Sequence, residues 1–214
     1  MGMARRPERT RRLVLCCAAL LAAACTRVVG GAAVPGSGEL PHPGVDVDEV
    51  LLDQPGMRAI TGAGDDLTII PSMDGNRPVD VDSLADEVPP LCRFVFAETA
   101  TFGSEIEQFH KITFQDPPKS ALISEGAGGY HDAGTAQHTF DALVASVDGC
   151  ATSPKGSLLI GEWSADEQSL HTRPGDCGRD YRVKSTVLLE VTFCGFPESV
   201  SGIVMANIAA KVPD

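Results

Sequence analysis

The chain has 214 residues, is 43% hydrophobic and carries a formal net charge of −12, with 29 acidic against 17 basic side chains. Nucleic-acid binding relies on a basic surface that displaces counterions, so this composition excludes nucleic acid as a partner. Peripheral binding to anionic lipid is disfavoured because like charges repel. The acidic stretches, such as residues 46–49, lack the spacing of an EF-hand calcium loop. A solvated acidic face is therefore the preferred interpretation of these residues.

The amino-terminal 24 residues have the pattern of an export signal. Five arginines precede an apolar run over residues 13–24, and Cys25 follows directly. Twelve apolar residues are too few to span a bilayer, which takes about 20, so we expect a signal peptide that is cleaved. The residues before Cys25, Leu21-Ala-Ala-Ala24, resemble a lipobox, in which the cysteine is lipidated and becomes the first residue of the mature protein. The alternative is an ordinary secretory signal with an incidental cysteine.

A low-complexity segment follows the signal. Residues 25–44 are rich in Gly, Pro, Ala and Ser and have no hydrophobic period, which predicts a flexible tether behind a lipid anchor at Cys25. The remaining residues, 45–214, suffice for one domain with its own core. Loss of residues 1–24, which carry five arginines and one glutamate, lowers the net charge from −12 to −16. We therefore expect attachment to the membrane to depend on the anchor.

Four cysteines lie in the predicted domain, at positions 92, 150, 177 and 194. An even count in an exported domain indicates two disulfides, and four cysteines allow three pairings. Zinc is the competing interpretation, but no Cys-x-x-Cys occurs and the spacings are long, so disulfides are preferred.

The first half of the domain is predicted to combine short helices with strands. The helical patterns are residues 48–53, residues 55–61 with Gly62 as the end, and residues 83–88. Strand patterns are residues 66–70, ended by Pro71, the alternating residues 108–114, and residues 121–123. The glycine-rich residues 126–129 are interpreted as a turn or bulge.

The second half contains the clearest helix, over residues 135–147, with Thr135 as a cap and Gly149 as the end. A hairpin is predicted from residues 157–163 and 167–171, and a long strand over 181–194 with one face in the core and one in water. A last helix runs from Ser199 to near Lys211. Strands follow one another without regular helical crossovers, which predicts an α+β fold with an antiparallel sheet and flanking helices.

The sequence contains no motif of catalysis, and we expect a non-enzymatic protein without a cofactor or a metal. Neither Gly-x-Ser-x-Gly nor His-Glu-x-x-His occurs. His131 and His138 lie two helical turns apart, about 10 Å, which is long for sharing a metal, so both are interpreted as surface residues. Tyr130, His131, Glu162 and Trp163 are placed at strand ends or loops, where side chains line clefts. Partly buried packing is the preferred interpretation of Trp163.

The order of these parts resembles the extracellular sensor domain of the mycobacterial serine/threonine kinase H, the PknH-like extracellular domain, which also occurs alone in mycobacterial lipoproteins. The resemblance rests on an early helix that ends in Gly62-Ala-Gly-Asp-Asp-Leu67, a cysteine after Pro89-Pro90, a helix with Phe140-Asp-Ala142 before the second cysteine, and two cysteines that bracket a strand. It covers residue 45 to the carboxyl terminus. It implies disulfides Cys92–Cys150 and Cys177–Cys194, each worth about 2–4 kcal/mol. It also implies an open polar cleft.

These observations predict a lipid-anchored protein of the cell envelope, outside the cytoplasm, with a sensor or ligand-binding domain. The expected partners are the membrane, through the lipid on Cys25, and a small-molecule or envelope ligand. The alternative is a carrier of lipid or glycolipid, which needs a large apolar cavity; the polar alternation of residues 181–194 argues against it. A pocket well above about 1,000 Å³ would favour the carrier, and an open acidic cleft would favour the sensor.

Overall fold

The computed structural model describes residues 45–214; the predicted signal peptide, Cys25 and the tether lie outside them. The domain is built on a seven-stranded sheet in the order β1-β2-β3-β7-β6-β5-β4, and every neighbouring pair is antiparallel. The strands are β1 (Thr68–Gly75), β2 (Ile106–Asp116), β3 (Ala121–Tyr130), β4 (Glu162–Ala165), β5 (Ser169–Arg173), β6 (Cys177–Lys184) and β7 (Val187–Cys194). The predicted α+β fold with an antiparallel sheet is confirmed.

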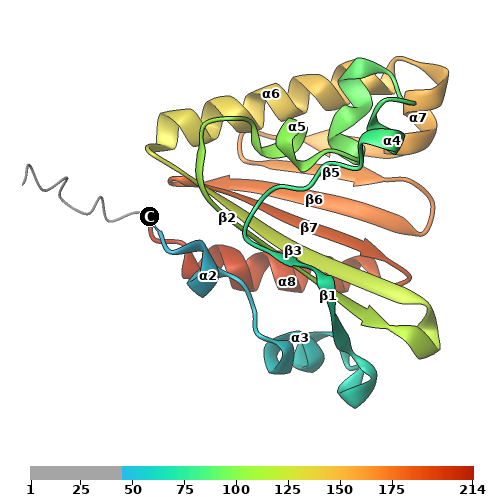
Figure 1. Cartoon of the computed structure of the whole chain (residues 1–214), viewed down its shortest axis with the longest axis vertical. Coiled ribbons are helices and arrows are strands. Elements are labelled where there is room, and N and C mark those ends of the chain that lie inside the picture. Colours follow the sequence, from blue (N-terminus) through green and yellow to red (C-terminus); the bar gives the residue numbers. More distant parts are fainter. Residues whose placement is uncertain (1–44) are drawn as a thin grey trace, which may run out of the picture. The chain divides into compact units, whose positions relative to one another are not determined.

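Helices cover both faces of the sheet (Figure 1). One face, called here the closed face, packs against α2 (Val47–Val50), α3 (Gln54–Thr61) and α8 (Glu198–Lys211). The other, called the pocket face, carries α4 (Asp82–Ala85), the 3-10 helix η2 (Pro90–Val95), α5 (Glu98–Phe102), α6 (Ala133–Ala151) and α7 (Pro154–Ile160). Two further 3-10 turns are η1 (Gly64–Asp66) and η3 (Pro117–Lys119). Each face has its own apolar core.

The alternation of side chains along a strand explains the two cores. In β7, Leu189, Val191 and Phe193 belong to the closed-face core, whereas Leu188 belongs to the core of the pocket face. Helices lie over both faces of this strand, so it is buried on both sides. The expectation that one face of residues 181–194 meets water was therefore wrong for Glu190, which is buried, whereas Arg182, Lys184, Thr186 and Thr192 are partly exposed.

The strand predicted over residues 181–194 is two strands. β6 and β7 form a hairpin that turns at Ser185 and Thr186, between the paired residues Lys184 and Val187. Ser185 adopts a positive φ of 52°, as tight hairpin turns require. Neither turn residue is Gly, Asn or Asp, and apolar residues continue on both sides, so no local pattern indicates a turn here.

The glycines interpreted as a turn or bulge lie inside β3, which pairs without a break from Ala121 to Gly129 with β2 and from Leu122 to Gly129 with β7. A Cβ on Gly128 would lie 2.7 Å from the Phe102 ring, so this position needs a residue without a side chain. The glycines of this strand leave room for the side chains that pack over it and do not change the direction of the chain.

The helices of the pocket face also differ from the prediction. Residues 157–160 belong to α7, which Ser153 caps through the Gly156 N–H, and only the following residues form the hairpin β4–β5. Helix α6 continues through Gly149 and Cys150 and is capped by Asp132 rather than Thr135. Helices η2 and α5 had not been predicted. In addition, β1 passes Pro71, which an edge strand tolerates at a bulge because no partner needs the missing N–H.

Two disulfides fix the chain, with the pairing that the family resemblance implies. Cys92–Cys150 joins η2 to α6, and Cys177–Cys194 joins the first residue of β6 to its cross-strand partner at the end of β7. The first holds η2 against the helix layer of the pocket face.

Among the helices of residues 45–214, none has the length and hydropathy of a membrane-spanning segment.

Candidate functional site

A pocket of about 470 Å³ lies on the pocket face, where η2 and α5 leave part of the sheet uncovered. Two rungs of the sheet form its floor. One rung runs from Lys111 on β2 across Gly126 on β3 to Glu190 on β7. The next runs from Thr113 across Ser124 and Thr192 to Arg179 on β6. Strand pairing alone therefore brings together polar side chains from four strands.

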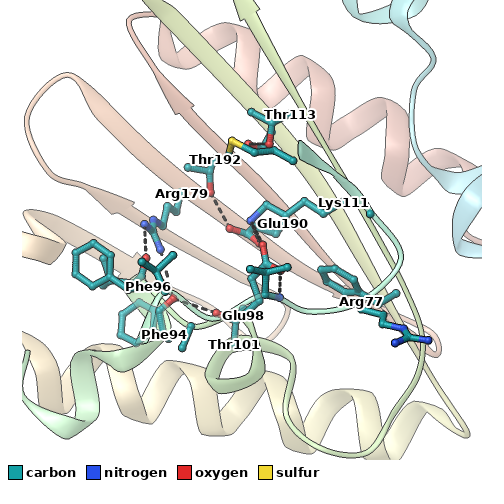
Figure 2. Close-up of a pocket in the computed structure, with 18 of the residues that line it drawn as sticks. Arg77, Phe94, Phe96, Glu98, Thr101, Lys111, Thr113, Arg179, Glu190 and Thr192 are labelled. Carbon is teal, nitrogen blue, oxygen red and sulfur yellow. Dashed lines mark hydrogen bonds and ion pairs between the residues drawn. The ribbon is translucent and has the colours of Figure 1, made fainter. Parts of the chain in front are cut away.

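The first rung is an ion-pair network (Figure 2). The Lys111 Nζ lies 3.2 Å from Glu190 Oε2 and 3.0 Å from Glu98 Oε1, on α5. Gly126 permits the first contact, because no side chain stands between Lys111 and Glu190 on the intervening strand. The Thr192 hydroxyl donates to Glu190 Oε1 at 2.7 Å. The lysine is thus shared by two carboxylates.

The network keeps its charges despite burial. Burial lowers the pKa of Lys111, but the charges of Glu190 and Glu98 outweigh it, so that the pKa is raised. Burial likewise raises the pKa of Glu190, but Lys111 and Arg179 outweigh it, and the pKa is lowered. Both groups are therefore held in their ionised forms at neutral pH. Mutual pairing of this kind is what a buried charge requires.

Arg179 supports the wall of the pocket from its floor. Its Nη2 donates to the Val95 carbonyl at 2.8 Å and its Nη1 to the Phe94 carbonyl at 3.4 Å. These carbonyls belong to the end of η2, where helix carbonyls lack intrahelical partners. The Thr101 hydroxyl donates to the same Phe94 carbonyl at 3.2 Å. The arginine therefore ties η2 to the sheet.

A strap, residues 76–81, leads from the edge strand β1 to α4 and lines one side of the pocket with Arg77, Val79 and Val81. Its far end is tied to the η2–α5 junction: the Val81 N–H donates to the Phe96 carbonyl at 2.8 Å. The Val79 N–H donates to Glu98 Oε2 at 2.7 Å. Because Glu98 also holds Lys111, one carboxylate connects the strap to the floor.

The lining is apolar at the walls and balanced in charge. Its six charged residues are three acids and three bases: Asp74, Glu98, Glu190, Arg77, Lys111 and Arg179. Apolar side chains come from Met73, Val79, Val81, Phe94, Phe96 and Phe109, among others. An acidic cleft was the expected mark of a sensor, and this pocket is not acidic. Its volume of about 470 Å³ is also less than half of the roughly 1,000 Å³ above which a lipid carrier would be favoured.

The residues that the sequence singled out lie elsewhere. Tyr130 is buried and its hydroxyl donates to the Phe102 carbonyl at 2.7 Å. Trp163 packs at the margin of the pocket-face core, as its preferred interpretation held. His131 contacts Glu107 and His138 is exposed. Within residues 45–214, no three His, Cys, Asp or Glu side chains are placed to hold a metal.

Sequence reasoning missed the pocket, although a signal for it exists. Lys111 alternates with His110 and Ile112 on a strand that was predicted correctly, and Glu190 lies on the face of β7 that was assigned to water. Opposite charges on alternating positions of two strands are compatible with a buried pair as well as with a solvated face. Only the strand order, with Gly126 between them, distinguishes the two.

The architecture defines an antiparallel α+β domain with a small-molecule-sized pocket on one face of its sheet. A family model described as the PknH-like extracellular domain matches residues 43–212, and the chain belongs to this family. Among solved structures, the crystal structure of the extracellular domain of PknH from Mycobacterium tuberculosis is similar, with a TM-score of 0.56 and 13% sequence identity. The match covers 77% of this chain and 93% of that one, and shows a shared fold. A comparison with curated proteins gave no significant match.

Proposed function

We propose that this protein is a lipid-anchored, non-enzymatic protein of the cell envelope whose domain binds a small ligand in the sheet-face pocket. Membership of a family of extracellular domains supports a place outside the cytoplasm. The lipobox-like residues before Cys25 support the anchor. The observation that carries the ligand-binding part is the pocket itself, about 470 Å³ and lined by apolar walls with a few polar groups, as ligand pockets usually are.

The paired state of the floor supports binding rather than catalysis. A general base or nucleophile needs a group that is free to accept or transfer a proton. Here Lys111 is held by two carboxylates, and Arg179 by two carbonyls. A ligand can lie above Lys111 and Arg179 without breaking these contacts. The pocket volume favours a small ligand over the acyl lipid of a carrier.

The anchor is tested by Cys25→Ser in cells fed a clickable fatty acid. We expect the wild-type protein to carry label and to sediment with membranes, and the variant to lose the label and appear in the soluble fraction. Cys92→Ser/Cys150→Ser, which removes a disulfide within the domain, is the matched control and should keep the label. A Cys25→Ser protein that stays labelled and membrane-bound contradicts the anchor.

Ligand binding is tested by native mass spectrometry of the protein purified from its host's envelope. We expect an added mass of small-molecule size on the wild-type protein. Val81→Trp, which places a large ring at the pocket wall, should reduce that species at least several-fold. Leu158→Trp adds the same ring at an exposed site on α7 and should leave it unchanged. Equal occupancy in the two variants would show that the ligand binds elsewhere.

A further inference from the structure

The floor of the pocket holds one hydroxyl proton that the protein leaves unused. Thr113 and Ser124 are 1% and 7% exposed, and their oxygens share one hydrogen bond of 2.8 Å. Two hydroxyls have two protons, and one bond uses only one of them. No other bond is formed by either side chain within residues 45–214. Whichever hydroxyl accepts in this bond therefore has a proton left to donate.

The other two threonine hydroxyls that line the pocket have no such surplus. Thr192 donates its proton to Glu190, and Thr101 donates its proton to the Phe94 carbonyl. The buried Tyr181 hydroxyl also lacks a hydrogen-bond partner within residues 45–214, but Tyr181 does not line the pocket. A buried donor without an acceptor costs about 1–3 kcal/mol. The Thr113–Ser124 pair is thus the point on the floor where an incoming acceptor gains the most.

The charges of the floor disfavour a ligand whose buried end is charged. Two cations, Lys111 and Arg179, stand beside two carboxylates, Glu98 and Glu190, so the floor has no net charge. A carboxylate or an ammonium would have to break one of these pairs or stay unpaired in a site with little water. Arg77 is the lining cation that forms no ion pair or hydrogen bond among the described residues, but it is exposed at the mouth. An exposed pair contributes only about 0–1 kcal/mol.

Apolar surface remains open at the walls. Met73, Val79 and Val81 are 49%, 63% and 45% exposed, although most large apolar side chains of the domain are buried. All three line this pocket, together with Phe94 and Phe96 of the η2 region. Covering such surface stabilises a complex by about 25 cal/mol for each Å² removed from water. The walls therefore favour an apolar body over a polyhydroxylated one.

We infer that the pocket takes a neutral, largely apolar molecule whose buried end carries a hydrogen-bond acceptor, such as a carbonyl, ester or ether oxygen, that receives the spare proton of the Thr113–Ser124 pair. The inference rests on the proposed ligand-binding function and specifies its ligand class. The apolar body lies between the strap and η2. Charged metabolites and free sugars are selected against, by the paired floor and the apolar walls respectively.

A fragment screen by protein-observed NMR tests the ligand class. The set has four groups of equal size: neutral apolar molecules with an acceptor, the matched molecules without one, carboxylates or ammonium ions, and polyhydroxylated molecules. We expect the first group to supply most of the fragments that shift the amides of β2, β3 and the strap. Decanoate, decylammonium and a neutral ten-carbon methyl ester form a matched trio, in which the ester should bind at least 10-fold more tightly.

Three variants test the spare proton. Thr113→Val and Ser124→Ala each leave one hydroxyl that is free to donate, so each should bind the ester within about 3-fold of wild type. The double variant has no donor left and should lose about 10-fold, while fragments without an acceptor bind as before. Removing both partners of a buried hydrogen bond is nearly neutral for stability, so the double variant should fold. Thermal unfolding checks this, and Ser146→Ala on α6, outside the pocket, is the neutral control.

The outcomes separate this inference from the proposed function. If charged or polyhydroxylated fragments dominate the hits at the pocket, the ligand class is wrong while ligand binding stands. If the double variant binds the ester as well as wild type does, the role of the hydroxyl pair is wrong. If no group shifts the pocket amides and no mass copurifies with the protein, both proposals fail together.

Discussion

Two buried glutamates on opposite faces of the sheet differ in their protonation state. On the pocket face, Lys111 and Glu190 are buried as a pair and stay ionised. On the closed face, Glu125 of β3 is fully buried in the apolar core under α2 and α3. Its Oε1 accepts the Leu52 N–H at 2.7 Å, and its Oε2 has no hydrogen-bond partner in the structure. Burial raises the pKa of this carboxyl to about 8.

The difference shows what decides the state of a buried acid. Both glutamates lie on central strands and have little or no contact with solvent. Glu190 has the cation Lys111 on its own rung of the sheet, whereas Glu125 has one backbone N–H and only the more distant charge of Lys211 in its favour, with Asp53 acting against it. A partner within contact distance preserves the charge, and without one the group holds its proton. Glu190 is therefore kept charged by its pairing on the pocket face, and Glu125 is a neutral acid on the closed face.

Breaking the pair should have the largest effect. Lys111→Met leaves Glu98 and Glu190 facing each other without their shared cation, so we expect a loss of about 3–5 kcal/mol in the free energy of unfolding. Urea denaturation measures it. Lys184→Met removes a lysine whose partner, Asp214, is fully exposed, and should cost about 1 kcal/mol or less. Equal losses in the two variants would mean that the floor pair is no stronger than a surface pair.

The neutral Glu125 should make the free energy of unfolding depend on pH. The unfolded chain releases the Glu125 proton near pH 4.5, and the folded one near pH 8. Between these values the folded state binds more protons, so the free energy of unfolding falls as pH rises, with a slope of up to about 1.4 kcal/mol per pH unit. Glu125→Gln should remove this slope and stabilise the protein at pH 8.

Denaturation at a series of pH values measures the slope for both proteins. Glu49→Gln alters an exposed acid on α2 and should leave the wild-type slope in place. A wild-type protein whose stability does not fall between pH 5 and pH 8 would contradict the neutral state of Glu125.

A smaller difference in stability is expected between glycine variants under the helices of the pocket face and in the open pocket. Gly128 and Gly126 lie two residues apart on the same side of β3. An added Cβ meets the buried Phe102 ring at 2.7 Å at position 128, but only ordinary contacts of 3.6 Å or more at position 126. Gly128→Ala should therefore cost about 1–3 kcal/mol and Gly126→Ala clearly less, as thermal unfolding would show. The reverse order would place the opening of the pocket elsewhere along the strand.

Local sequence signals predicted the frame of the fold but not its details. Helix α3 begins and ends where Pro55 and Gly62 indicate, and β2 includes the strand predicted over residues 108–114. The glycines of β3 and the hairpin at Ser185 were misassigned because their backbone is set by cross-strand packing, not by local preference. The disulfide pairing came from the family resemblance, since spacing alone allowed three solutions.

The site was less accessible from the sequence than the fold. Polar residues at strand ends, such as Tyr130 and Trp163, were natural candidates and prove to be packing residues. The floor residues Lys111 and Glu190 are 79 positions apart and meet only because β3 lies between β2 and β7. A contact across three strands has no signal within any one of them.

The position where the described chain begins has a mechanical consequence. Val45 packs against the closed-face core, and α2 and α3 follow on the same face, whereas the pocket opens on the opposite face of the sheet. Any force that reaches the domain through the residues before Val45 therefore acts first on the closed face, where α2 follows and packs against α8. None of these elements lines the pocket, which lies on the other face of the sheet.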